Sequence, residues 1–532
     1  MTHCGTRTGS DSIGIKTNQA GTAAKDLRPR PGPPSAGDIV LVHIQFILDT
    51  GEGFGSVRTP QNDSSAQGCL RFGDEKRSGC KSAVYAGNVS GEAEAPVRFA
   101  PVSSETSPTL LASDFPNIMT AAMNEKEDCQ WPVFVPFSIP GETVWVRIHN
   151  TFARHSSGFI VAHVGGPSPR RSTPPCPYFG MCSGCQYQHM PLQMQHSVKR
   201  EHVRGVLRRL AGLPWSIVVN KVVSDNQLGG YHYRSKITPH YSFYREGSIP
   251  AVGYNCVKSP RRVLEIQSCK LALPSINEKL TELRKQVSVQ AQTPSASPAT
   301  KSRRKGATLL LCDNGQNAVT SDPAALCAAT DVDGLQCWYR AGDFFQVNRR
   351  VLPLLVSHVR EQLRDARAYP STRACRRLLL DCYCGVGLFA LACHDDFEAV
   401  VGFDVCASSI ELARYNAQCN SKWRARFETS DARNFFDSFP AELSPSDTTR
   451  VCVVVDPPRK GCDTDFLRRL IKLSPERIVY ISCHPATQAR DVKILREAYT
   501  VTNVQPFDMF PHTRHIECVV TLERCTEDQA GG

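Results

Sequence analysis

The alternation of apolar and polar residues predicts a small β-barrel in the first third of the chain. GDIVLVHIQFILDTGEGFG, WPVFVPFSIPGETVWVRIHNTF and SGFIVAHV place apolar residues at about every second position between Gly37 and residue 166. This period is that of a half-buried strand, and short strands joined by Gly and Pro turns are typical of a barrel. We therefore predict a barrel at 37–166 with a long insertion at about 59–130, where the sequence has little periodicity.

The pattern changes from residue 351 to residue 532, where buried strands alternate with helices. RLLLD, AVVGFD, VCVVVDPP and RIVYISC are continuous apolar runs typical of strands covered on both faces, and SSIELARYNAQCN has helical spacing. This alternation predicts an α/β fold with a doubly wound, Rossmann-like parallel sheet. Ligands of such sheets bind at the carboxyl ends of the strands. The residues that close the strands are therefore candidates for a site: Asp381, Asp404, Asp456 and Cys483.

Between these two parts, residues 167–350 predict a central α+β domain. QMQHSVKREHVRGVLRRLAGL has helical spacing with basic residues between the apolar ones, and YHYRSKITPHYSFY and SIPAVGYN are strand-like. We predict a disordered Ser/Pro-rich loop at about 286–306 and a disordered N-terminal segment at 1–36, because neither holds enough apolar surface to fold. No stretch has the length of apolar residues needed to span a bilayer, so we expect no membrane association.

The positive charge of the chain lies in the central domain. The formal net charge is +11, and between Pro167 and Arg262 there are 14 Lys and Arg against 3 acids, an excess that equals the whole net charge. Basic residues alternate there with aromatic ones, which is typical of an RNA-binding surface, although an ordinary solvated sheet is the alternative. The interleaved residues are Tyr231, Tyr233, Arg234, Lys236, Tyr241, Tyr244 and Arg245.

The 23 cysteines indicate a reducing compartment, because no secretory signal precedes them. We expect the cytoplasm or the nucleus rather than the mitochondrion, since the N-terminal segment has no clear Arg-rich amphipathic face. Cys176, Cys182 and Cys185 form a C-x5-C-x2-C motif, and Cys269 follows on the far side of the basic segment. Four thiolates suit either an iron-sulfur cluster or zinc, so the spacing leaves the metal open.

A Gly-rich turn after RLLLD indicates a nucleotide cofactor. In CYCGVGLFA, Gly385 and Gly387 allow a tight turn that approaches a ligand closely. Asp404 closes the next strand, where a carboxylate can accept hydrogen bonds from both ribose hydroxyls of an adenosine cofactor, and Asp431 could bind the adenine amino group. NAD would suit the same residues, so this pattern alone does not choose between cofactors.

The later strands favour methyl transfer over hydride transfer. VVVDPPRKG places two prolines after Asp456, which makes a rigid turn against which a flat base can lie. VYISCHPAT ends the adjacent strand with Cys483. Carbon 5 of uracil becomes nucleophilic only after an addition at carbon 6, for which a thiolate is well suited, and Glu517 in PHTRHIECVVTLER can then remove the carbon 5 proton. Taken alone, a structural cysteine and an exposed carboxylate remain the simpler readings.

Five ordered motifs resemble the signatures of the RNA uracil-5-methyltransferase family: FFQVN, DCYCGVGLF, DPPRKG, SCHPAT and HIE. The resemblance spans most of the chain and implies an S-adenosylmethionine-dependent enzyme that makes 5-methyluridine in RNA. It implies that Cys483 is the nucleophile and Glu517 the base. The residues that it assigns to contacts with the cofactor or the target base are Gln346, Tyr383, Asp404 and Asp456, with Asp431 less closely matched.

The chain departs from the family pattern at two positions near the site. His484 follows the nucleophile where the family usually has Asn, and Leu388 is apolar at the last contact of the cofactor loop. These differences bear on fine positioning and leave the reaction class unchanged.

The resemblance extends to the front half of the chain. The barrel resembles the TRAM domain, an OB-like RNA-binding module. A subset of the family carries a 4Fe-4S cluster on the cysteine motif and its trailing QH, although Ser183 here replaces a usual Gly. We expect this cluster to be structural or to organise the RNA, without a redox step in the methyl transfer, and we expect a monomer. Cluster-bearing relatives tend to methylate ribosomal RNA and others transfer RNA, so ribosomal RNA is slightly favoured.

Two other functions compete with this interpretation. An RNA cytosine-5-methyltransferase would place its cysteine beside the proline motif, where this chain has Asp456. An iron-sulfur RNA-binding protein without catalysis gives no reason for Cys483 and Glu517 to occur together. Methyl transfer from labelled cofactor distinguishes the enzyme from the binding protein.

Overall fold

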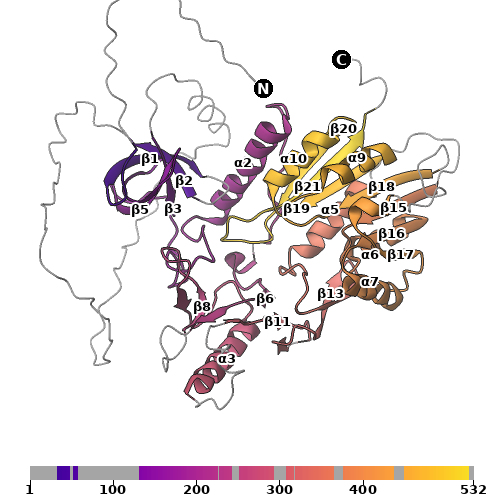
Figure 1. The fold of residues 1–532 in the computed structure, drawn as a ribbon, viewed down its shortest axis with the longest axis horizontal. Coiled ribbons are helices and arrows are strands. Elements are labelled where there is room, and N and C mark those ends of the chain that lie inside the picture. The colour runs from indigo at the N-terminus through magenta and orange to yellow at the C-terminus, as the bar shows by residue number, and fades with distance from the viewer. Residues whose placement is uncertain are drawn as a thin grey trace, which may run out of the picture.

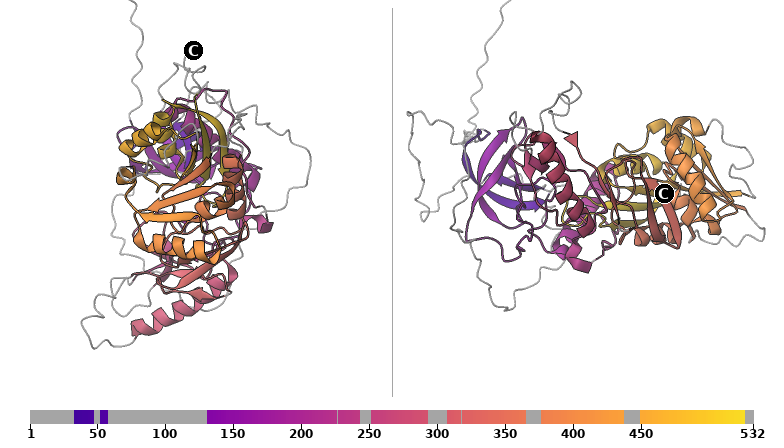
Figure 2. Two further views of the ribbon diagram at one scale, coloured as in Figure 1. Left: turned by 90° about the vertical axis from the view of Figure 1, so that its right-hand side faces the viewer. Right: turned by 90° about the horizontal axis from the view of Figure 1, so that it is seen from below.

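The computed structural model shows a barrel and a large sheet toward opposite ends of the long axis, with the central domain below and between them in the view of Figure 1 (Figures 1 and 2). The predicted insertion at 59–130 and the N-terminal segment up to residue 32 lie outside the residues that the structure describes. No helix in the described part of the chain is long and apolar enough to cross a membrane. The structure describes residues 33–47, 52–57, 131–225, 227–242, 251–292, 307–316, 318–364, 376–436 and 449–525.

Five strands close the barrel in the order β1-β2-β3-β5-β4. These strands are β1 (Ile39–Ile47), β2 (Glu52–Val57), β3 (Pro132–Pro136), β4 (Thr143–Thr151) and β5 (Ser156–His163). Every second side chain points inward, so that the interior is filled by Val42, Ile44, Val133, Val135, Val144, Val146 and Ile148. The barrel predicted from the two-residue period is confirmed, and closure removes the exposed edges that an open sheet of this size would have.

The central domain consists of two small sheets and two long helices. The sheets have the orders β10-β7-β8-β9 and β12-β11-β6. The strands are β6 (Lys236–Ile237), β7 (His240–Ser242), β8 (Ala251–Asn255), β9 (Val263–Glu265), β10 (Ala307–Thr308), β11 (Leu311–Asp313) and β12 (Val319–Thr320). The other elements are α2 (Leu192–Ala211), the short 3-10 helix η1 (Gln227–Gly230) and α3 (Pro274–Gln292).

Helix α3 corrects one predicted boundary. The disordered loop was predicted to begin at about residue 286, but residues 286–292 belong to the helix. The reason is the helical spacing of Ile276, Leu280, Leu283 and Val287, which gives α3 an apolar face that is buried against the small sheets.

The C-terminal sheet has seven strands in the order β17-β16-β15-β18-β19-β21-β20. The strands from β17 to β19 run parallel, whereas β21 runs antiparallel to both of its neighbours. The predicted Rossmann-like α/β sheet is confirmed, with one antiparallel strand added. The strands are β15 (Arg376–Cys382), β16 (Ala399–Asp404), β17 (Ala425–Thr429), β18 (Thr449–Val455), β19 (Arg477–Ser482), β20 (Tyr499–Phe507) and β21 (Glu517–Arg524).

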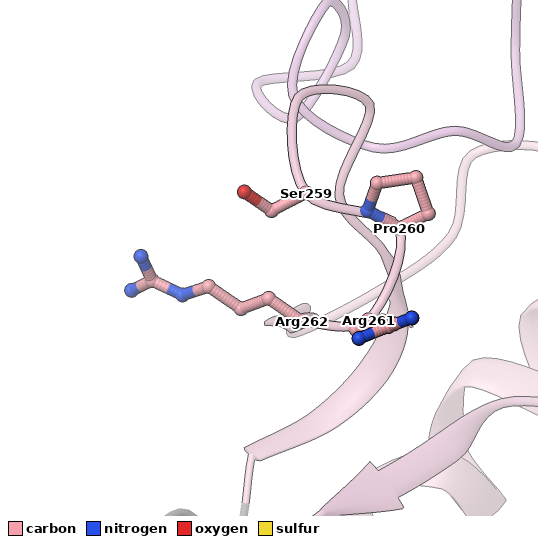
Figure 3. A pocket seen from close by; sticks show the side chains of 4 residues that line it. All are labelled: Ser259, Pro260, Arg261 and Arg262. Carbon is pink, nitrogen blue, oxygen red and sulfur yellow. The ribbon is translucent and has the colours of Figure 1, made fainter.

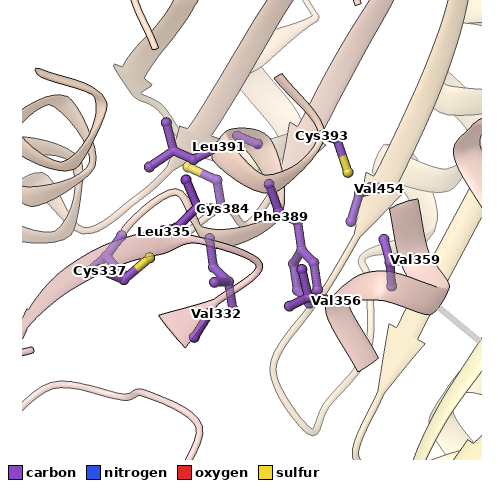
Figure 4. Close-up of a cluster of buried hydrophobic side chains, with 14 of the residues drawn as sticks. Val332, Leu335, Cys337, Val356, Val359, Cys384, Phe389, Leu391, Cys393 and Val454 are labelled. Carbon is purple, nitrogen blue, oxygen red and sulfur yellow. The ribbon is translucent and has the colours of Figure 1, made fainter. Parts of the chain in front are cut away.

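Two apolar layers bury the two faces of this sheet. On one face, Leu379 and Val454 pack against the hairpin β13 (Leu326–Val332)–β14 (Leu335–Arg340) and against three helices, as Figure 4 shows in part. On the other face, Leu378 and Leu380 join a second cluster with the remaining helices. The helices are α5 (Leu352–Arg364), α6 (Leu388–Ala392) and α7 (Ala407–Cys419) on the first face, and α2, α8 (Ala432–Phe435), α9 (Thr464–Leu473) and α10 (Pro485–Leu495) on the second.

Helix α2 connects the barrel to the sheet, as its place between them in Figure 1 indicates. Its N-terminal half contributes Met194 and Val198 to a cluster with the barrel residues Ile47 and Ile139. Its C-terminal half joins the core of the second sheet face with Val203, Val206, Leu207 and Ala211. One helix therefore sets the position of the barrel relative to the sheet.

We predict that truncating a core side chain of β15 destabilises the protein strongly. Leu380 is fully buried, so Leu380→Ala should cost about 2–5 kcal/mol by lost burial and by the cavity that remains. The exposed Leu354 of α5 is the matched control, and Leu354→Ala should change stability by less than about 0.5 kcal/mol. Urea denaturation followed by circular dichroism measures both, and equal shifts in the two midpoints would contradict the core assignment.

Candidate active site

The strands of the sheet bring the candidate residues to one edge. Parallel β15, β16, β18 and β19 end there with Asp381, Asp404, Asp456 and Cys483 in or directly after them. Because β21 is antiparallel, it begins at this edge. Ser482 is paired with Cys518 in the β19–β21 register, so Cys483, which follows β19, and Glu517, which begins β21, each lie one residue beyond this pair. Side chains more than 100 residues apart along the sequence therefore meet around the switch in strand order.

The Gly-rich turn after β15 has the backbone conformation that its sequence predicts. Gly387 has φ 86°, and a Cβ there would lie 2.9 Å from Phe427 Cζ, so a larger residue would clash. Gly385 has φ 53°, and a Cβ there would meet no atom within 4 Å, so the turn presents an open face. Tyr383 also has a positive φ, 63°, which non-glycine residues rarely adopt. The turn is thus shaped for close approach by a ligand.

The Asp404 carboxylate fixes this turn against the end of β16. Its Oδ2 accepts a hydrogen bond from Gly385 N at 3.1 Å, and its Oδ1 accepts one from Cys406 N at 2.8 Å. These bonds hold the carboxylate beside the open face of Gly385. A ribose can therefore meet a pre-oriented acceptor there.

Asp381 is fully buried beneath the turn. Its Oδ2 accepts a hydrogen bond from Ala390 N at 2.8 Å, and its Oδ1 has no hydrogen-bond partner among the described residues. Burial and, to a smaller extent, the charges of Asp456 and Asp404 raise the pKa of Asp381 to about 8, against the lowering effect of the Ala390 hydrogen bond. The side chain is therefore mostly protonated at neutral pH and supports the first turn of α6.

Burial opposes ionisation of the three acidic groups at the strand ends, Cys483, Asp456 and Glu517. Burial and, to a smaller extent, the charge of the Glu517 carboxylate raise the pKa of the Cys483 thiol to about 11. Burial raises the pKa of Asp456 to about 7 and, together with the Asp456 charge, raises the pKa of Glu517 well above its ordinary value. Two carboxyls and a thiol thus share a site where they cannot all be charged at neutral pH.

Arg459 counters this accumulation of negative charge. Its charge and a hydrogen bond to the thiol lower the pKa of Cys483, and its charge also lowers the pKa of Glu517. It lies in the turn after β18, and its Nη2 is 3.4 Å from His515 Nδ1. Sequence reasoning missed Arg459, because one arginine in an exposed turn of a basic protein gives no signal beyond its place in DPPRKG.

The remaining predicted contact residues lie in different elements. Gln346 is buried after β14, and the Tyr383 ring packs edge-on against Phe466 with centroids 5.6 Å apart. Asp431 is the N-cap of α8, where its carboxylate accepts hydrogen bonds from Arg433 N at 2.9 Å and Arg433 Nε at 3.1 Å. Burial raises the pKa of Tyr383, and the charge of Asp431 makes a small further contribution in the same direction, so the two side chains lie near each other.

The four predicted metal ligands share one neighbourhood in the central domain. Burial and, to a smaller extent, the charges of Cys269 and Cys176 raise the pKa of Cys182 to about 11. The pKa of Cys185 is raised by burial and by the same three thiols. In the described part of the chain, no group of three or more His, Cys, Asp or Glu side chains has the geometry of a metal site. Sequence reasoning missed a fifth thiol, Cys256, which forms a backbone bridge with Cys182.

The aromatic residues of the basic stretch lie partly inside the protein. Tyr233 is only 3% exposed, and its hydroxyl donates to a backbone oxygen at 3.3 Å. The prediction that Tyr233 offers a stacking face was therefore wrong, because its ring packs in the interior. The Tyr231 ring stacks on His512 at 4.0 Å, and Lys236 Nζ donates to a backbone oxygen at 2.7 Å. Tyr244 and Arg245 lie outside the described residues.

Two surface hollows lie outside the strand-end site. One, of about 730 Å³, lies at the turn between β8 and β9, where two arginines project from the backbone (Figure 3); it is lined by Ser259, Pro260, Arg261 and Arg262. The other, of about 510 Å³, lies beside the N-terminus of α2; its lining includes Gln188, His196, Tyr231 and His512. Neither hollow is lined by Asp381, Asp404, Asp456, Cys483 or Glu517.

Comparisons with known sequences identify the family. Residues 358–525 match the family described as tRNA (Uracil-5-)-methyltransferase. The tRNA (uracil(54)-C(5))-methyltransferase of Schizosaccharomyces pombe is 34% identical over 410 residues, which cover 74% of this chain and 74% of that protein. The protein of the same name from Saccharomyces cerevisiae is 29% identical, over 74% of this chain and 69% of its own length.

A solved structure supports the fold. The tRNA (uracil-54, C5)-methyltransferase of Pyrococcus abyssi, crystallised with S-adenosyl-L-homocysteine, has a TM-score of 0.51 and 22% sequence identity, over 73% of this chain and 95% of that one. Together with the sequence relatives, these findings establish that the chain belongs to the tRNA (uracil-5-)-methyltransferase family and is an S-adenosylmethionine-dependent RNA (uracil-5-)-methyltransferase.

Proposed function

We propose that this enzyme methylates carbon 5 of uracil 54 in transfer RNA, with Cys483 as the nucleophile and Glu517 as the base. The choice of transfer RNA over ribosomal RNA rests on the two yeast relatives, whose names give uracil 54. The observation that carries the residue roles is the pairing of Ser482 with Cys518, which brings the neighbouring Cys483 and Glu517 to the same edge of the sheet. Burial and then the Glu517 charge raise the pKa of the Cys483 thiol there.

The first step requires the thiolate form of Cys483. Arg459 lowers the pKa of this thiol against the effect of burial, so the guanidinium favours the nucleophilic form. The thiolate adds to carbon 6 of the uracil, a carbon–sulfur bond forms, and the electron pair of the carbon 5–carbon 6 double bond moves toward the oxygen on carbon 4. Carbon 5 is then nucleophilic.

The strand ends and the Gly-rich turn suit S-adenosylmethionine. Asp404 would accept hydrogen bonds from its ribose, the open face of Gly385 would admit its backbone, and Gln346, Tyr383, Gly387, Asp431 and Asp456 would complete the contacts. Bound there, the cofactor supplies an electrophilic methyl group to carbon 5. Asp456 and the prolines after it would orient the base.

The last step requires a general base. Glu517 is 2% exposed, and its raised pKa makes its carboxylate a stronger proton acceptor than an exposed one. It removes the proton from carbon 5, the electron pair of that C–H bond restores the double bond, and the bond between carbon 6 and sulfur breaks. The thiolate is thereby released.

We further propose that the barrel is a TRAM domain that holds RNA together with the basic central domain. The target base must leave its stack to reach Cys483, because the attacked atoms are shielded in folded RNA. Phosphate contacts by Arg261 and Arg262, which lie on an exposed turn, suit this grip.

We also propose that Cys176, Cys182, Cys185 and Cys269 hold a 4Fe-4S cluster. Their donor chemistry fits, because four thiols that influence one another's pKa lie together with no disulfide. Such a cluster would crosslink the start of the central domain to the segment that follows β9. We assign it a structural role.

The proposed function is tested with labelled S-adenosylmethionine and separate pools of transfer and ribosomal RNA. Wild type should form 5-methyluridine in transfer RNA, and Cys483→Ala should reduce the rate by a factor of at least about a thousand. Cys419→Ala, which changes an exposed cysteine at the end of α7, is the matched control and should remain active. Product only in ribosomal RNA, or full activity of Cys483→Ala, would refute the proposal.

The role of Arg459 is tested by thiol reactivity. Arg459→Met removes the charge and the hydrogen bond that lower the pKa of Cys483, so its pKa should rise above about 11. Below that pH, each unit of increase lowers the thiolate fraction about tenfold. Alkylation of Cys483 by iodoacetamide, followed by mass spectrometry from about pH 7 to about pH 10, should be slower in this variant, whereas Lys460→Met should match wild type. Equal rates in all three proteins would remove Arg459 from the mechanism.

The metal is tested by direct analysis of protein purified without oxygen. About four iron and four sulfide per chain are expected, and Cys269→Ser should lower both. Cys256→Ser changes a thiol in the same neighbourhood that is outside the proposed ligand set, so it should retain the iron. Zinc in place of iron, or loss of iron only with Cys256→Ser, would contradict the assignment.

A further inference from the structure

The loop between β20 and β21, residues 508–516, leads directly into Glu517. Several of its backbone groups are bound by residues from the central domain and the segment after β14. Met509 O accepts a hydrogen bond from Asn348 Nδ2 at 3.1 Å, and His512 O accepts bonds from Gln186 N at 3.1 Å and Tyr187 N at 3.0 Å. The position of this loop therefore depends on parts of the chain that precede the sheet.

A buried ion pair fixes the start of the loop. Lys199 Nζ of α2 donates to Asp508 Oδ1 at 2.6 Å, and both side chains are fully buried. The same ammonium donates to Phe510 O at 3.1 Å, and His196 Nε2 lies 3.3 Å from Asp508 Oδ2. The Asp508 carboxylate also accepts a bond from Phe510 N at 3.2 Å. One lysine of α2 thus binds both a side chain and the backbone of the loop.

A second contact from the same helix fixes the middle of the loop. Gln195 Oε1 accepts a hydrogen bond from His512 N at 2.9 Å, and Gln195 Nε2 donates to Met190 O at 2.8 Å. His512 has φ 65°, a conformation that side chains of this size rarely adopt without outside support. Gln195 and Lys199 are one helical turn apart, so they present their polar groups on one face of α2.

The buried Lys199–Asp508 ion pair is better explained by a role in positioning the loop than by a contribution to the stability of the fold. Two charges that leave water lose hydration, and their mutual attraction repays this loss only when the geometry is good, so an apolar pair often serves stability equally well. A charged pair does specify a unique geometry, since any displacement leaves a buried charge unpaired. The pair lies on the loop that carries the proposed base, where geometry matters most.

We infer that Lys199, Asp508 and Gln195 are positioning residues that hold the 508–516 loop so that Glu517 can reach the carbon 5 proton. The inference rests on the proposed role of Glu517. Their loss should slow proton removal and the release of Cys483, while the earlier formation of the covalent RNA adduct continues. The methylated adduct between protein and RNA should therefore accumulate.

The experiment follows this adduct on denaturing gels in single turnovers with full-length enzyme, transfer RNA and labelled S-adenosylmethionine. Glu517→Gln is the reference and should retain the labelled adduct. Asp508→Asn should retain it at least about tenfold longer than wild type, which corresponds to a misplaced base. Glu523→Gln is the matched control: Glu523 pairs with Arg477 at 2.6 Å near the opposite end of β21, and its variant should release the adduct as wild type does.

Gln195→Leu keeps the inference testable if Asp508→Asn does not fold, because it removes the hold on His512 without leaving a buried charge unpaired. Prolonged adduct in either folded variant, with normal release by Glu523→Gln, supports the inference. If Glu517→Gln retains the adduct and the folded α2-contact variants release it normally, the inference is overturned. If Glu517→Gln itself releases the adduct normally, the proposed base is wrong and the inference fails with it.

Discussion

Strand β21 runs antiparallel between β19 and β20, and this direction determines what the sheet can do. A parallel strand in that place would begin at the opposite edge and carry Glu517 away from the ends of β18 and β19. The antiparallel direction instead starts β21 at the edge where β19 ends, with Cys518 paired to Ser482. Backbone hydrogen bonds between β19 and β21 hold this register, and a slip by one residue would exchange the side chains that pack in the two apolar layers. The spacing of Cys483 and Glu517 is therefore a property of the fold.

The same edge concentrates groups that oppose one another's ionisation. Asp381, Asp456 and Glu517 have raised pKa values for the common reason of burial, and each charge that forms raises the pKa of a neighbour. Arg459 is the positive group that acts on both the Cys483 thiol and Glu517. This arrangement suits a reaction in which a thiolate is needed first and a carboxylate later, because one cation can favour whichever of the two is ionised.

The sequence predicted those parts of the structure that follow from local patterns. Period-two alternation predicted the barrel. The ends of continuous apolar runs predicted the positions of Asp404, Asp456 and Cys483, because such runs indicate buried parallel strands whose carboxyl ends meet at one edge. Arg459 and Cys256 were missed because their interactions, with Cys483 and Glu517 in one case and with Cys182 in the other, form only when the folded chain brings these residues together. Tyr233 was misassigned for a related reason: an aromatic residue between basic ones has the same pattern whether its ring faces solvent or packs inside. The predicted loop began too early, at about residue 286, because Ser and Pro dominate the composition after it while the helical spacing continues up to Val287.

Helix α2 contacts three parts of the protein: the barrel, the loop before β21 and the core of the sheet. Met194 packs toward the barrel, Lys199 binds the loop before β21, and Leu207 lies in the core of the sheet. A helix transmits position along its length, since bending it would break backbone hydrogen bonds. The positions of the barrel, the loop and the sheet relative to one another consequently depend on this one helix. A basic helix of this kind looks from its sequence like a surface for RNA, yet Lys199 is fully buried and its charge is used inside the protein to place a backbone.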